Sequence, residues 1–215
     1  MPINVLRNKT PQQVHDDVNG FPLRYITDWN DWLTVDDGKR WSLFGKIMRK
    51  WQATRPNRMR RLQQEAQHAP PYLDDLIRKA QRQLEVLGYL TVSNIHQRTA
   101  FQEKALRALW TIFANLPVKG IASCVGRTKA VLLLTNGRIG PALDSRVRRN
   151  LRIGPPTTPQ EWISLLGEIA DDIDYFEARH HQLFREIVPA QFAHLEYGRL
   201  YDMALGPRGR PRVEG

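Results

Sequence analysis

The spacing of apolar residues predicts helices along most of the chain. In residues 41–51 they recur at intervals of three and four, which gives a helix one apolar face made of Leu43 or Phe44, Ile47, Met48 and Trp51. Residues 72–87 repeat this pattern, and Gly88 follows where that helix would end. Asn19-Gly20 and Asp37-Gly38 are predicted to be turns.

Capping patterns predict where two later helices begin. Thr99 followed by Gln102 is a capping box and predicts a helix over residues 99–115. Thr158 to Glu161 combines a capping box with a proline at the first helical position, and predicts a helix to about residue 187. A last helix is expected over residues 190–205. Since no stretch alternates long enough for a sheet, the sequence predicts a mainly α, two-lobed protein.

The net charge of the chain indicates what kind of partner this helical protein binds. The 215 residues are 41% hydrophobic, which is ordinary, but they carry a formal charge of +10 and an isoelectric point of about 10.1. A polyanion is therefore the expected partner, most simply nucleic acid, and no apolar run suggests a membrane span. One cysteine excludes a disulfide framework within the chain. The N-terminus lacks the apolar core of a signal peptide, so a cytoplasmic protein is expected.

Basic residues concentrate between residues 41 and 65. No acidic residue interrupts the chain from Gly38 to Gln64, and Pro56 is expected to end the helix there. A solvated helix face is one interpretation of such a run. We favour phosphate contacts, which supply affinity without base specificity, through Lys46, Arg49, Lys50, Arg55 and Arg58.

The stretch from residue 123 to residue 151 carries the candidate chemistry. It predicts a tight turn at Val125-Gly126 and a short apolar helix over residues 128–135. Asn136-Gly137 would end that helix, because both residues tolerate the left-handed conformation. After a loop, Asp144 stands alone among five arginines, which favour the ionised carboxylate. Asp144 is also suited to cap the following helix, a role that does not exclude a chemical one.

This stretch resembles the helix-hairpin-helix DNA glycosylase superfamily, and is most similar to compact proteins related to 8-oxoguanine DNA glycosylase. Val125-Gly126 matches the end of the family's Gly-Val-Gly hairpin, and residues 128–134 match its second helix. Residues 141–147 match the loop and the acidic segment, with Asp144 at the essential acid. Residues 117–123 would form the first helix of the motif. The resemblance covers roughly residues 100–205.

Two positions depart from the family pattern. Cys124 stands where the first hairpin glycine is expected, and Thr128 aligns with the lysine that forms a Schiff base in bifunctional members. Lys129 is one residue further on, and one residue along a helix turns a side chain by roughly 100°. The resemblance therefore favours a monofunctional glycosylase. In it, Asp144 would activate water or stabilise the charge that grows on the sugar of a flipped nucleotide. Lys129 would be catalytic if the strand is also cleaved.

The resemblance also implies that double-stranded DNA is the partner. Backbone N–H groups of the hairpin and nearby side chains would bind phosphates through Val125, Gly126, Arg127, Thr128, Lys129, Arg146, Arg148 and Arg149. The chain would divide into an N-terminal helical basic region (1–95), a glycosylase-like domain (96–205) and a basic flexible tail (206–215). No cofactor is expected, no metal site is expected around Glu177, His180 and His181, and the protein is expected to be a monomer.

Two other functions stay open at this point. A non-catalytic DNA-binding module on the same fold would explain the missing lysine and hairpin glycine. A helical domain that binds RNA or protein would make the hairpin match coincidental. The sequence does not name the target base, because residues distant in the chain would form the pocket walls. Candidates for those walls include Tyr25, Trp41, Trp51 and Trp110.

Overall fold

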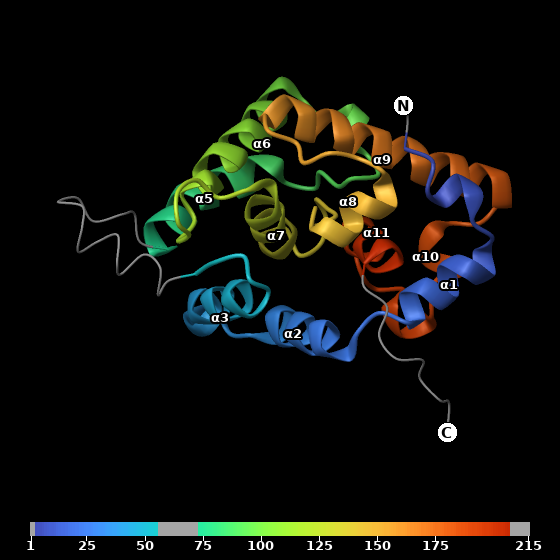
Figure 1. Ribbon diagram of the computed structural model, residues 1–215, viewed down its shortest axis with the longest axis horizontal. Coiled ribbons are helices and arrows are strands. Elements are labelled where there is room, and N and C mark those ends of the chain that lie inside the picture. Colours follow the sequence, from blue (N-terminus) through green and yellow to red (C-terminus); the bar gives the residue numbers. More distant parts are fainter. Residues whose placement is uncertain (1–2, 56–72, 207–215) are drawn as a thin grey trace.

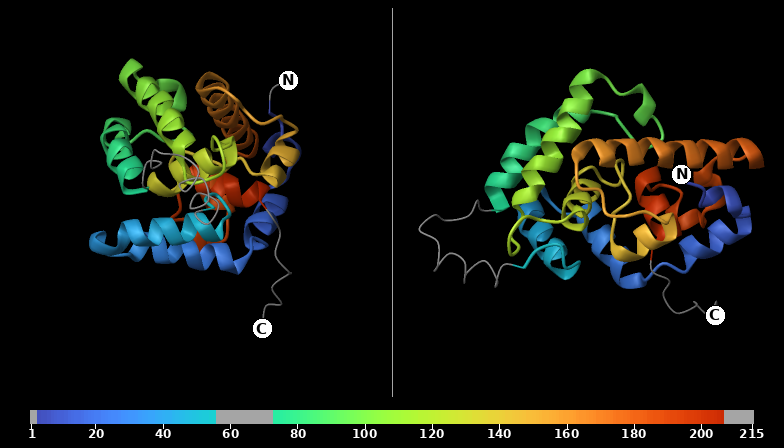
Figure 2. Two further views of the ribbon diagram at one scale, coloured as in Figure 1. Left: turned by 60° about the vertical axis from the view of Figure 1, so that its left-hand side comes forward. Right: turned by 45° about the horizontal axis from the view of Figure 1, so that its top comes forward.

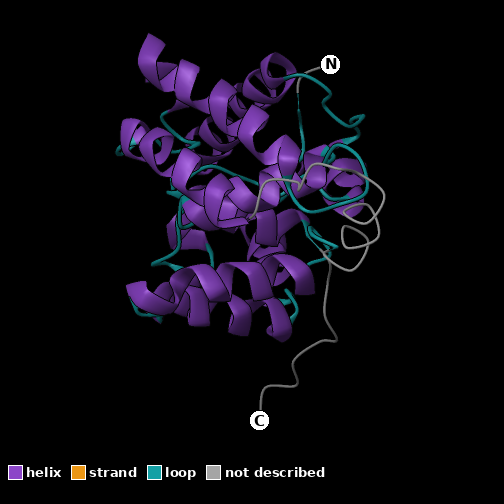
Figure 3. Cartoon of the chain, turned by 90° about the vertical axis from the view of Figure 1, so that its left-hand side faces the viewer, coloured by secondary structure: helices purple, strands orange, loops and turns teal. Residues whose placement is uncertain are grey.

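The computed structural model describes residues 3–55 and 73–206, and these contain ten α-helices and no strand (Figure 3). The mainly α prediction is thus confirmed for this part of the chain. Arg58 and the tail after Gly206 lie outside the described residues. The helices are α1 (Pro11–Asn19), α2 (Leu23–Thr34), α3 (Asp37–Lys50), α5 (Leu73–Leu87), α6 (Ala100–Ile112), α7 (Cys124–Leu134), α8 (Ser145–Leu151), α9 (Pro159–His180), α10 (Phe184–Ile187) and α11 (Tyr197–Leu205).

The helices form two outer layers around a central group (Figures 1 and 2). Helices α2 and α3 make one layer, and α6 and α9 lie on the opposite side. Between them lie α7, α8 and α11. Helix α7 contacts both α3 and α6, and α8 packs on α11. The central group therefore holds the stretch that carries the candidate chemistry.

Several helix ends lie where the sequence predicts them. The Thr99 hydroxyl accepts a hydrogen bond from the Gln102 amide N–H, and the Gln102 side chain accepts one from Thr99 N–H, which completes the capping box of α6. The Thr158 hydroxyl caps α9 by accepting from the Glu161 N–H, but the predicted capping box is not formed there, because the Glu161 carboxylate accepts from the Thr157 N–H instead. Gly88 and the pair Asn136-Gly137 have positive φ angles after α5 and α7, as expected for helix ends.

Other predicted bounds are wrong. The long helix expected to residue 187 ends at His180, because His181 adopts the left-handed conformation and the chain turns into α10. Residues 190–205 form a short 3-10 helix (Ala190–Phe192) and then α11, which begins only at Tyr197. Asp37-Gly38 is the first turn of α3 rather than a loop, since Asp36 takes the N-cap position.

One cluster of buried apolar side chains extends through the described part of the chain, from Ile3 to Leu205. Asp172 of α9 lies within it and is fully buried. Its carboxylate accepts hydrogen bonds from the Leu6 N–H and the Tyr201 hydroxyl, at 2.9 Å each, so it ties the N-terminal segment to α9 and α11. Helices α5 and α6, which flank the expected domain boundary at residue 95, pack on each other. The division into two domains stays a prediction.

Helix α11 approaches the chain after α7 with no side chain between the two backbones. A Cβ atom at Gly198 would lie 2.6 Å from both the Gly137 oxygen and the Gly140 nitrogen. The backbone N–H of Arg199 donates to the same Gly137 oxygen at 3.0 Å. The position of α11 therefore depends on glycine at residue 198.

We expect Gly198→Ala to lower the free energy of unfolding by about 3 kcal/mol, because the added methyl group would push backbone against backbone. Gly154→Ala is the matched control, since no atom lies within 4 Å of a Cβ there and its φ is not positive. Denaturant unfolding followed by circular dichroism measures both. Equal stability of the two variants would contradict the close contact.

Candidate functional site

Lys129 and Asp144 meet at one small cavity of about 30 Å³ in the middle of the molecule. Five helices and their ends contribute to its walls, so residues far apart in sequence converge there. The cavity is large enough for one or two water molecules. Its lining residues are Phe21, Tyr25, Trp51, Lys129, Ala142, Asp144, Val147, Arg199 and Asp202.

Asp144 is the N-cap of α8, as the sequence predicts. Its Oδ1 atom accepts hydrogen bonds from the Arg146 and Val147 N–H groups, at 2.9 Å each. The other carboxylate oxygen has no hydrogen bond within the described residues. The cap fixes the direction of the carboxylate and leaves one oxygen free at the cavity.

Lys129 lies on α7 and reaches the same cavity. Its ammonium group donates a hydrogen bond of 2.7 Å to the Trp51 carbonyl oxygen, which joins α7 to the end of α3. Burial lowers the pKa of Lys129, while the carboxylates of Asp144 and Asp202 act in the opposite direction. A desolvated lysine of this kind is a stronger nucleophile near neutral pH than an exposed one.

Thr128, the residue that aligns with the family's lysine, points into the core instead. Only 2% of it is exposed, and its hydroxyl donates to the Cys124 carbonyl and accepts from the Leu143 N–H. It therefore joins α7 to the segment before α8 and is not at a surface that DNA could reach. The side chain that faces the cavity is the neighbouring Lys129.

Aromatic rings form one wall of the cavity. The Trp51 ring stacks on the buried Trp29 ring, with 6.4 Å between centroids and 4° between planes, and Tyr25 meets Trp51 edge-on. The Trp51 indole N–H donates to Asp28 at 2.9 Å, and Lys50 forms an ion pair with the same carboxylate. Of the wall candidates named from the sequence, Tyr25 and Trp51 line the cavity. Trp41 and Trp110 do not.

An ion pair between Arg199 and Asp202 lies next to this wall and also lines the cavity. The Arg199 side chain is 2% exposed, and its guanidinium donates to Asp202 at 2.7 Å. It also lies 4.8 Å from the Phe21 ring centroid and 4.5 Å from that of Trp29. The second Asp202 oxygen accepts from the Ala142 N–H. Nothing in the sequence singles out this pair, because two charges three residues apart on a helix are typical of an exposed face.

The predicted hairpin is wrong in its local structure. Residues 117–123 are not a helix, and Val125-Gly126 is not a turn but part of the first turn of α7, with Ser123 as N-cap. A Cβ atom at Gly126 would lie 3.2 Å from the Ala53 oxygen and 3.3 Å from a Leu116 methyl carbon. Glycine is needed there for internal packing rather than for close approach of DNA.

The predicted phosphate-binding residues fall into two groups. Lys46, Arg49, Arg55, Arg146 and Arg149 are exposed, as is Lys50 despite its ion pair with Asp28. Arg127 and Arg148 are half-buried and already bonded to carbonyl oxygens, Arg127 to that of Ala122 and Arg148 to that of Leu143. The exposed residues are therefore the ones that are available to a polyanion.

The described residues were expected to hold no metal site around Glu177, His180 and His181. In these residues, no group of three or more His, Cys, Asp or Glu side chains could hold a metal ion. Glu177 instead accepts hydrogen bonds from the Phe184 N–H and the Tyr197 hydroxyl. No helix in these ranges is long and apolar enough to cross a membrane.

Asp202→Asn should change how stability depends on pH. Burial raises the pKa of Asp202 from 3.8 to about 6, so between these values the folded chain holds a proton that the unfolded chain has lost. This group therefore removes up to about 3 kcal/mol of unfolding free energy as the pH rises from 4 to 7. Asp172 and Asp174 also have raised pKa values, but both proteins retain them. Denaturant unfolding at each pH should show a smaller loss for the variant, and parallel curves would contradict the prediction.

No family model, curated protein or solved structure matches this chain.

Proposed function

We propose that the protein is a DNA glycosylase that removes a damaged or modified base with Lys129 and Asp144 as its catalytic residues. The observation that carries this proposal is the meeting of these two side chains with three aromatic rings at one cavity. An amine, a carboxylate and flat apolar walls suit a flipped nucleotide, whose base stacks while its sugar reacts. The net charge of +10 supports a nucleic-acid substrate.

The position of Lys129 favours covalent chemistry over the monofunctional reaction expected from the alignment. The neutral amine would attack C1′ of the sugar, and the base would leave with the electron pair of the glycosidic bond and take up a proton. Asp144 would stabilise the positive charge that grows on the sugar, through its free oxygen. Opening of the sugar ring would then give an imine on Lys129, through which the strand could be cleaved.

DNA contact in this proposal involves the loop before α7. Residues 116–123 connect the helical segment ending at Asn115 to α7, and Lys119, Gly120 and Ile121 in it are exposed. With α6 and α7 on either side, this loop would take the part of the hairpin. The N–H groups of the first turn of α7 and the exposed side chains of Lys46, Arg49 and Arg55 would hold phosphates of the duplex.

The size of the cavity supports a second candidate, a DNA-binding module without catalysis. A volume of about 30 Å³ is far below that of a base, so a flipped base could enter only after a wall moves. Tyr25 is the least enclosed of the three rings. A wall that does not open would leave a protein that binds DNA and releases no base.

Base release by the wild type, Asp144→Asn and Lys129→Ala tests the proposal. Duplexes carrying a panel of damaged and modified bases would be incubated with each protein and examined with and without alkali. We expect each variant to lose at least about 100-fold in excision rate. Borohydride should trap a covalent DNA complex with the wild type but not with Lys129→Ala.

Asn can accept the cap hydrogen bonds of α8, so Asp144→Asn removes the charge and keeps the helix start. Unchanged duplex affinity of both variants is the control for folding. Cleavage that requires alkali, without a trapped complex, would indicate a monofunctional glycosylase instead of the covalent mechanism. If no base is released from any duplex of the panel while duplex binding is intact, the protein is the non-catalytic DNA-binding module.

A further inference from the structure

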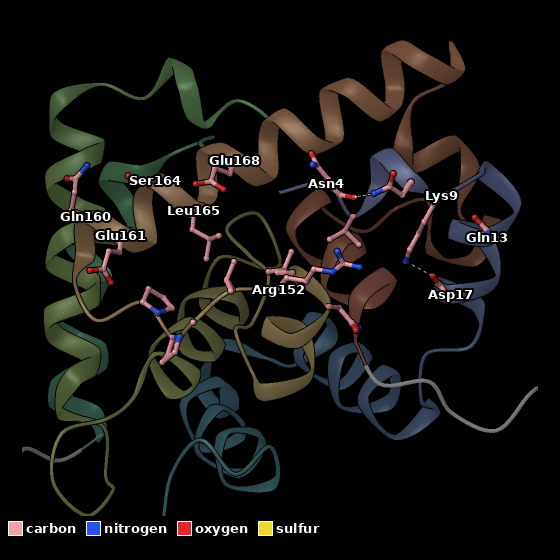
Figure 4. Close-up of a pocket in the computed structure, with 18 residues that line it drawn as sticks. Asn4, Lys9, Gln13, Asp17, Arg152, Gln160, Glu161, Ser164, Leu165 and Glu168 are labelled. Carbon is pink, nitrogen blue, oxygen red and sulfur yellow. Dashed lines mark hydrogen bonds and ion pairs between the residues drawn. The ribbon is translucent and has the colours of Figure 1, made fainter. Parts of the chain in front are cut away.

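A long groove lies beside the candidate cavity and has no part in the proposed excision chemistry. Its wide part, about 1180 Å³, lies between the N-terminal segment, α9 and the chain that follows α8 (Figure 4). Its narrow part, about 510 Å³, lies between α8, the N-terminal segment and the end of α11. The two parts are continuous, because both are lined by Val5, Lys9, Asp17 and Asn150. We name the whole the α8 groove.

The α8 groove adjoins the cavity. Gly206 lines the narrow part, and a Cβ atom there would lie 2.5 Å from an edge carbon of the Phe21 ring, which lines the cavity. Helix α8 also borders both spaces, with Asp144 at the cavity and Arg146 and Arg149 at the groove. The cavity and the groove are therefore neighbours, separated by the packed contact between Phe21 and Gly206.

The groove carries free positive charge. Arg146 and Arg149 line its narrow part and Arg152 its wide part, and all three are exposed without an ion pair among the described residues. Three acidic side chains line it as well, Asp17 in both parts and Glu161 and Glu168 in the wide part. Asp17 forms an ion pair with Lys9, while Glu161 accepts hydrogen bonds from Thr157 and keeps its charge. The excess of positive charge therefore lies in the narrow part, at Arg146 and Arg149, and favours an anion there.

The remaining lining suits bases. In the narrow part the walls include the apolar residues Val5, Met203 and Leu205. In the wide part they include carboxamide side chains, which can bond the polar edges of bases, at Asn4, Asn8, Gln13, Asn150 and Gln160. A basic track for phosphates is one component of a single-strand site, and here Val5, Met203 and Leu205 would take the place of the aromatic rings on which bases usually stack. A stiff duplex would not bend into such a groove without a large cost.

We propose that an unpaired DNA strand next to the target nucleotide lies in the α8 groove, with its phosphates on Arg146, Arg149 and Arg152. The substrate class is then DNA with a single-stranded segment beside the target, such as an overhang or a bubble. The placement of the target rests on the proposed glycosylase function. The binding of the strand can be measured with no excision at all.

Fluorescence anisotropy tests this proposal with three labelled DNA probes, a 12-nucleotide single strand, a blunt duplex and a duplex with an overhang. The variant Arg146→Ala/Arg149→Ala/Arg152→Ala should bind the single strand and the overhang at least tenfold more weakly, and the blunt duplex less than threefold more weakly. Its slope of log affinity against log salt should fall by about 2, at about 0.7 per lost phosphate contact. The matched control is Lys79→Ala/Arg82→Ala/Lys104→Ala on α5 and α6, which removes the same charge at exposed positions away from the groove.

The proposal is overturned if the blunt duplex binds as tightly as the overhang, or if the groove variant and the control behave alike. Asp144→Asn separates it from the proposed function, since this variant should keep full strand affinity. Tighter binding of the overhang without any base release would refute the glycosylase function and support strand binding in the groove. If the wild type and the groove variant excise a base from blunt duplexes at the same rate, strand binding in the groove is refuted and the glycosylase function is supported.

Discussion

The buried ion pair of Arg199 and Asp202 is the interaction on which the geometry of the candidate site depends. Taking two charges out of water costs several kcal/mol for each ion, so the pair needs close partners. Asp202 finds them in Arg199 and in the Ala142 N–H, which fixes α11 to the segment before α8. Arg199 packs its guanidinium on the Phe21 and Trp29 rings, which fixes the aromatic wall. Lys129 and Asp144 hold their separation because these parts cannot shift independently.

The cap role of Asp144 is compatible with the catalytic role that we propose for it. One oxygen is held by two backbone N–H groups, so the carboxylate cannot rotate away from the cavity, and the other oxygen remains available. Lys129 is held in the same manner by the Trp51 carbonyl. Groups oriented before a substrate arrives need little reorganisation during a reaction. The fixed orientation of both groups thus supports the catalytic pair that we propose.

Local signals in the sequence were enough to predict α5, α6 and the start of α9, because apolar spacing and capping residues act within a few positions. The cap at Asp144 was predictable for the same reason. The start of α7 was not, since Val125 and Gly126 are helical only where Gly126 can pack against Ala53 and Leu116, a tertiary contact. The bounds of α7 do not decide which of its side chains faces the cavity. The packing of α7 against α3 decides this, and local sequence patterns do not predict that packing.

The backbone contact between Gly198 and the chain at Gly137 and Gly140 fixes one half of the cavity, the half lined by Ala142, Arg199 and Asp202, and leaves the other half adjustable. On the fixed half, no side chain separates the two backbones, so a larger residue there cannot be offset by a smaller neighbouring side chain. On the other half, α2 meets the cavity through the Tyr25 side chain, and the end of α3 meets it through the Trp51 ring and the Trp51 carbonyl that holds Lys129. Changes of ligand preference during evolution would therefore collect in residues 21–51, while residues 137–144 and 198–202 stay constant beneath them.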